Sequence, residues 1–176
     1  MTTERRRIDR ILDPEYLEGV ESMDLAELRS RRDLAQTVEK ELSYFRRLLQ
    51  GRLDLLAFEQ RRRRGEETRS LIEALPEILT TGVRSGQDLS GRYLSTDLPD
   101  MPAKGRRHID RVLGNDLMVR LGEIDEDELG EATAELADLE TEVSSLRKQV
   151  QAVVDRLQDE VKDRYKATLA EPAPPL

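Results

Sequence analysis

One set of polar side chains occurs twice in this sequence, with the same residue types at the same spacing. When residues 39–54 are placed over residues 140–155, an offset of 101 positions, six of sixteen positions are identical. Five of these identities follow the pattern E-x3-S-x2-R-x3-Q-x3-D. The ten residues are Glu39, Ser43, Arg46, Gln50 and Asp54 in the first copy, and Glu140, Ser144, Arg147, Gln151 and Asp155 in the second.

These residue types suit a planar, anionic ligand that carries hydrogen-bonding edges. An arginine guanidinium can grip a phosphate or a guanine edge with two parallel hydrogen bonds, and it can stack on a base. A carboxylate such as Asp54 can accept hydrogen bonds from guanine, while serine and glutamine supply adaptable polar contacts. Glu39 could orient Arg46 along the same helix. The repeat therefore indicates a ligand-binding surface.

Both copies fall in stretches that are predicted to form long helices, 24–64 and 126–168. Neither stretch contains a proline, and each contains one glycine, Gly51 or Gly130. Asp24 with Glu27, and Asp125 with Glu128, give the spacing that caps a first helical turn. Apolar residues recur at heptad spacing, which favours coiled-coil packing. They are Leu28, Ala35, Val38, Leu42, Phe45, Leu49 and Leu56, then Leu129, Ala132, Leu136, Leu139, Val143, Leu146, Val150, Val153 and Leu157.

The polar repeat forms one stripe on each predicted helix. At about 100° per residue, its five positions fall within an arc of about 80° that borders the apolar seam. Since each helix has one seam, the economical arrangement pairs the two helices within one chain. The direction of pairing does not follow from spacing alone.

The rest of the chain is predicted to be less regular. Residues 1–23 form an N-terminal arm with a short helix that ends at Asp13-Pro14. Residues 65–125 connect the long helices: 66–79 has helical spacing interrupted by Pro76, 85–105 is a long loop, and 105–125 suggests a short helix or two. Residues 169–176 form a disordered tail.

Composition excludes several classes of protein. There is no cysteine and a single histidine, His108, which leaves no plausible metal set, and aromatic residues make up only 3%, which disfavours a β-sandwich. We find no phosphate-binding loop and no nucleophile motif, so we expect no enzyme. No stretch is apolar enough to be a signal peptide or to span a membrane, and a cytoplasmic location fits.

The charge distribution bears on the partner. The net charge is −8, and a basic footprint of the kind that DNA-binding domains show is missing, which disfavours direct DNA binding. The run Arg61–Arg64 is better explained as the positively charged end of a helix than as a nucleic-acid patch. An acidic chain could instead complement a basic protein.

The duplicated pattern resembles the signature of the RsiG family, actinobacterial anti-sigma factors that bind cyclic di-GMP, and all ten positions match. The resemblance implies an all-α fold in which the two long helices form an antiparallel intramolecular coiled coil. It also implies that the ten residues bind a pair of cyclic di-GMP molecules and that the liganded protein sequesters a WhiG-type sigma factor from core RNA polymerase, which represses late sporulation genes. The alternatives are a coiled-coil structural adaptor without a nucleotide ligand and, last, a helical regulator that contacts DNA.

Overall fold

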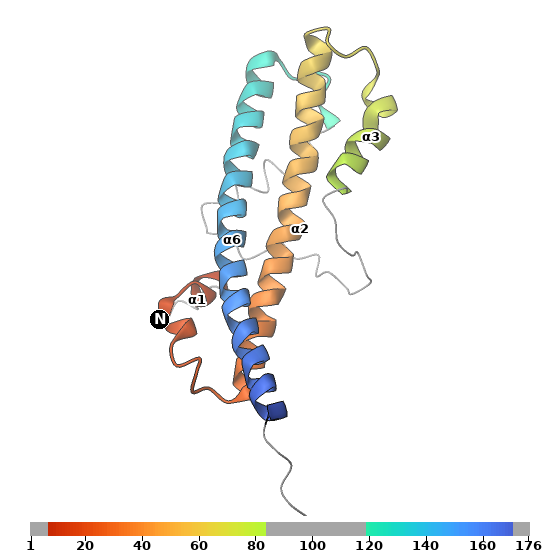
Figure 1. The fold of residues 1–176 in the computed structure, drawn as a ribbon. Helices are drawn as coiled ribbons and strands as arrows, with labels where there is room; N and C mark the ends of the chain where they lie inside the picture. The colour runs from red at the N-terminus through yellow and green to blue at the C-terminus, as the bar shows by residue number, and fades with distance from the viewer. Residues whose placement is uncertain (1–6, 84–118, 171–176) are drawn as a thin grey trace, which may run out of the picture. The chain divides into compact units, whose positions relative to one another are not determined.

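We describe a computed structural model of the chain, over residues 7–83 and 119–170, with the side chains of 79–83 and 170 left aside. These residues fall into two compact units, one formed by 1–42 with 145–176 and the other by 43–144. Each unit contains part of two long helices, α2 (Leu25–Arg63) and α6 (Glu126–Ala170), which pack closely against each other (Figure 1). The predicted fold class is confirmed.

The predicted cap residues start both long helices. Asp24 accepts a hydrogen bond of 2.8 Å from the backbone N–H of Glu27, and Asp125 does the same for Glu128. Each bond satisfies an amide that the first helical turn would otherwise leave without a partner. The first long helix was predicted over 24–64 and is observed over Leu25–Arg63. The second was predicted over 126–168 and is observed over Glu126–Ala170.

The apolar seam is the core within each unit. The fully buried seam residues occur every seven positions, as the heptad predicts: Leu28, Ala35, Leu42, Leu49 and Leu56 on α2, and Leu129, Leu136, Val143, Val150 and Leu157 on α6. Burying a leucine or valine side chain in this way contributes roughly 1.5–3 kcal/mol to the stability of the folded chain. The seam therefore fixes which side chains of each helix remain at the surface.

In the first unit, the N-terminal arm packs against the helix pair. Helix α1 (Arg7–Ile11) buries Ile8 and Ile11 and ends before Pro14, as predicted. The sequence did not indicate the short 3-10 helix η1 (Pro14–Leu17) that follows it. Arg7 of the arm forms two hydrogen bonds, of 2.9 and 3.1 Å, with Glu41 on α2.

In the second unit, helix α3 (Leu71–Val83) packs against α2 through Ala74 and Ile78. The predicted interruption at Pro76 is wrong, because α3 continues through this residue. Proline has no N–H to donate to the carbonyl of Ile72, so α3 lacks one helical hydrogen bond at this point. A capping box at Ser70 and Glu73, with hydrogen bonds of 2.7 and 3.3 Å, supports the start of α3.

Several predictions lie outside the described residues. These are the loop 85–105, most of the short helices expected over 105–125, His108, and the tail beyond Ala170. Among the helices that the structure describes, none is long and apolar enough to cross a membrane.

Candidate functional site

The motif residues lie beside the apolar seam, where most of them are partly covered. Nine of the ten side chains are of intermediate exposure, and Asp155 is exposed. Helical periodicity explains this placement, because the motif positions border the stripe of buried heptad residues, such as Leu42 and Val143, on the surface of each helix. The two units hold different parts of the motif.

The second unit holds Ser43, Arg46, Gln50 and Asp54 of α2 together with Glu140 and Ser144 of α6. Glu140 is the centre of this set. Its Oε1 atom lies 3.5 Å from Nη1 of Arg46, and it accepts hydrogen bonds from Nε2 of Gln50 at 3.1 Å and from Oγ of Ser144 at 3.0 Å. Three motif side chains, two from α2 and one from α6, therefore meet at the carboxylate of Glu140.

The first unit holds Glu39 of α2 together with Arg147, Gln151 and Asp155 of α6. Nη1 of Arg147 donates a hydrogen bond of 3.3 Å to Oε1 of Glu39. Nε2 of Gln151 donates a hydrogen bond of 2.8 Å to Oδ1 of Asp155, one turn further along α6. The motif glutamine thus contacts a glutamate in one set and an aspartate in the other. The motif arginine contacts a glutamate in both sets.

Each motif arginine pairs with the motif glutamate of the other long helix. The side chains of Arg46 and Arg147 are both 28% exposed, and those of Glu140 and Glu39 are 19% and 18% exposed. We expected Glu39 to orient Arg46 along its own helix, and these contacts run instead between the helices. The reason is that an antiparallel pair brings the start of one motif copy opposite the arginine of the other.

One buried polar atom of the motif has no hydrogen-bond partner among the described residues. The Nε atom of Arg147 is buried and has no hydrogen-bond acceptor. Leaving a buried donor without a partner costs roughly 1–3 kcal/mol. An acceptor placed beside this atom would remove the cost.

A buried carboxylate holds the end of α2 in the second unit. Glu59 is 3% exposed and accepts hydrogen bonds of 2.8 Å from Arg62 and Arg63. The hydrogen bond from Arg62 lowers the pKa of Glu59, burial acts in the opposite direction, and the bond from Arg63 lowers the pKa further. Arg63 also donates to the backbone carbonyls of Leu121 and Ile124, which lie just before α6. The sequence signal was the Glu59-Arg63 spacing of four residues, which the prediction of a charged helix end overlooked.

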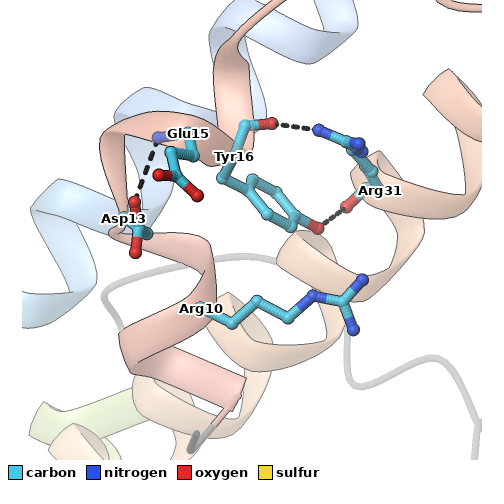
Figure 2. A pocket seen from close by; sticks show the side chains of 5 residues that line it. All are labelled: Arg10, Asp13, Glu15, Tyr16 and Arg31. Atoms are coloured by element: carbon cyan, nitrogen blue, oxygen red, sulfur yellow. Dashed lines mark hydrogen bonds between the residues drawn. The ribbon is translucent and has the colours of Figure 1, made fainter.

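A cavity of about 170 Å³ lies elsewhere in the first unit, lined by Arg10, Asp13, Glu15, Tyr16 and Arg31 (Figure 2). The hydroxyl of Tyr16 donates to the carbonyl of Arg31, and Nη1 of Arg31 donates to the carbonyl of Tyr16. Burial raises the pKa of Tyr16. No motif residue lines this cavity, and its contacts hold the arm on α2.

Comparison with known families agrees with the resemblance seen in the sequence. A family model described as RsiG-like matches residues 14–79. The predicted recognition is confirmed over this part of the chain. The matched region contains the first motif copy, while the second copy lies outside it and is supported by the internal repeat. No curated protein matches the chain.

The RsiG-like match indicates an anti-sigma factor role and therefore a regulator that interacts with a sigma factor. The match covers η1, all of α2 and most of α3. These elements carry the arm contacts, the first motif copy and the helix packed beside it.

Proposed function

We propose that this protein is a non-enzymatic, cytoplasmic anti-sigma factor that binds cyclic di-GMP through the ten motif residues and, when liganded, sequesters a WhiG-type sigma factor. A pair of nucleotide molecules binds each chain. Release of the nucleotide frees the sigma factor for core RNA polymerase and permits transcription of late sporulation genes. The observation that carries this proposal is the duplicated motif, in which each arginine is paired with the motif glutamate of the other helix.

The chemistry of the two residue sets supports a guanine nucleotide. Arg46 and Arg147 are held at one Nη atom by a carboxylate, and each guanidinium has further N–H groups that can bind a phosphate or a guanine edge. Asp54 and Asp155 can accept hydrogen bonds from the N1–H and N2–H groups of guanine. Adenine lacks those two donors, which is a reason to expect selection against cyclic di-AMP.

Charge sets a condition on this binding. Cyclic di-GMP is a dianion, and the chain has a net charge of −8. The long-range field therefore repels the ligand, and the arginines of the motif must supply the attraction at short range. Nucleotide binding and sigma-factor binding are linked equilibria. The nucleotide therefore strengthens the complex only if it binds the complex more tightly than it binds the free chain.

The proposal is tested by measuring complex formation with a purified WhiG-type sigma factor. We expect a complex in the presence of cyclic di-GMP, and a much weaker one with GTP, with cyclic di-AMP or without nucleotide. A complex of equal affinity under all four conditions would favour the adaptor without a nucleotide ligand. Absence of a complex in every condition would contradict the proposed partner.

A further inference from the structure

The motif residues of the two units, called here the first-unit set and the second-unit set, differ in the contact of their glutamine. In the second unit, Nε2 of Gln50 donates to Oε1 of Glu140, on the other long helix, at 3.1 Å. In the first unit, Nε2 of Gln151 donates instead to Oδ1 of Asp155, on its own helix, at 2.8 Å. The same residue type at the same motif position therefore has a different acceptor in each unit.

This difference decides whether the motif aspartate is available to a ligand. Asp54 accepts no hydrogen bond from the residues that the structure describes, and its side chain is half-buried beside the seam. A partly desolvated carboxylate forms strong hydrogen bonds, because little water competes for it. The second-unit set therefore presents an open acceptor in the free chain.

The aspartate of the first-unit set is exposed to water and already has a donor. Gln151 donates to Oδ1 of Asp155, as glutamine and aspartate four residues apart on a helix commonly pair. Guanine presents N1–H and N2–H side by side, and a carboxylate accepts both by using its two oxygen atoms. A guanine edge at Asp155 thus competes both with Gln151 for Oδ1 and with water.

The arginine of the first-unit set is also less well satisfied. Nε of Arg147 is buried and has no acceptor among the described residues, whereas the second-unit set, all of which is described, contains no such atom. A ligand cannot reach a buried atom until the side chains around it move, and until then the donor keeps its cost. The contacts of Gln151 and of Arg147 both indicate that the first-unit set must rearrange before it binds.

We propose that the two sets are not equivalent and that cyclic di-GMP fills them in order. The second-unit set, with Asp54, binds one nucleotide first, and the first-unit set, with Asp155, binds the other about tenfold more weakly. This inference rests on the proposed function for the identity of the ligand. Two sets of equal readiness would instead fill together, since they contain the same arginine, glutamine and aspartate.

Calorimetric titration of the full-length wild type with cyclic di-GMP tests the order. We expect two steps of one nucleotide each, separated by about tenfold in affinity. A single step that takes up two nucleotides with one affinity would overturn the inference and leave the proposed function intact. If the wild type binds no cyclic di-GMP, the proposed function fails and the inference with it.

Asp54→Asn and Asp155→Asn assign the two steps to the two sets. Asparagine has nearly the same size as aspartate but accepts through one oxygen atom only, so it cannot pair with both guanine donors. Asp155→Asn should keep the first step within about twofold of the wild-type affinity and lose the second. Asp54→Asn should lose the first step, so that no binding remains at the nucleotide concentrations that saturate this step in the wild type.

The matched control is Asp138→Asn, on the exposed surface of α6 and outside the motif, which should give both steps unchanged. Neither motif aspartate is a seam residue, so helical content measured by circular dichroism should be retained in every variant. Equal losses in Asp54→Asn and Asp155→Asn would overturn the inference, and so would loss of the first step in Asp155→Asn alone. Either result would leave cyclic di-GMP as the ligand of the motif.

Discussion

Glu140 of α6 lies 3.5 Å from Arg46 of α2, measured from Oε1 to Nη1, and the same oxygen atom accepts hydrogen bonds from Gln50 and Ser144. A carboxylate that contacts the guanidinium at one nitrogen restricts its rotation and leaves its other N–H groups for a second partner. The glutamate of the motif is therefore a positioning residue for the arginine of the opposite helix.

Substituting this glutamate should weaken nucleotide binding more than it weakens the fold. We expect Glu140→Gln to lower the affinity for cyclic di-GMP about tenfold, because Arg46 loses its charged partner. The unfolding free energy should change by at most about 1 kcal/mol, since the pair is partly exposed. Calorimetric titration and urea denaturation measure the two effects, with the exposed Glu142→Gln as the control. A variant that binds the nucleotide more tightly would show that Glu140 competes with the ligand.

Salt should weaken nucleotide binding. The screening length is about 8 Å at 0.15 M salt, so the long-range repulsion from the net charge of −8 is largely screened there. Raising the salt concentration from about 0.15 to 1 M then acts mainly on the short contacts between arginine and phosphate. Titrations at several concentrations should show a steady fall in affinity. An affinity that is independent of salt would mean that the motif arginines do not contact the phosphates.

Much of this architecture was predictable because it depends on local periodicity. Leu28, Ala35, Leu42, Leu49 and Leu56 recur every seven residues, and the structure buries all of them. The caps at Asp24 and Asp125 also follow from sequence spacing alone. Helix starts and seams are determined by neighbours within a few turns, so a single sequence is enough to locate them.

The contacts that depend on tertiary structure were not predictable. Glu39 was expected to orient Arg46 on its own helix, and its contact with Arg147 requires knowing which positions of the two helices lie opposite each other. The passage of α3 through Pro76 depends on the packing of Ala74 and Ile78 against α2, which outweighs the local cost of proline. The contact between Arg63 and the carbonyls before α6 is likewise set by the fold.

Acid should destabilise the protein partly through Glu59. The hydrogen bond from Arg62 is the main cause that holds the pKa of this carboxyl below its ordinary value of 4.5, so its ionised form stabilises the folded chain. This stabilisation by the ionised carboxylate is fully present when the pH is above the ordinary pKa. It is lost as the pH falls through the lower pKa of the folded state. We expect Glu59→Gln to cost about 1–3 kcal/mol at pH 7. Its stability should also fall less steeply than that of the wild type below about pH 4.5.

Urea denaturation across this pH range is the measurement, and Glu131→Gln on the exposed surface of α6 is the control. Parallel curves for the wild type and Glu59→Gln would contradict a role for Glu59 in the acid response.

Glycines at three positions should respond in opposite directions to alanine. Gly65 has a φ of 75° and ends α2, with hydrogen bonds from its own N–H to Arg62 and from Glu66 to Arg61. Gly65→Ala should destabilise the chain by about 1 kcal/mol, because side chains disfavour this conformation. Gly51→Ala and Gly130→Ala should each stabilise it by up to about 1 kcal/mol. Equal effects at all three positions in chemical denaturation would contradict the assigned helix end.

The most direct test of the nucleotide site is calorimetric titration of the full-length protein with cyclic di-GMP, comparing the wild type with Arg46→Ala and Asp54→Ala. Arg156→Ala is the control, since Arg156 pairs with Glu21 outside the motif. We predict selective binding of cyclic di-GMP over GTP and cyclic di-AMP by the wild type and the control, and loss of binding in both motif variants with helical content retained. Absence of selective binding in the wild type, or wild-type affinity in both motif variants, would contradict the account.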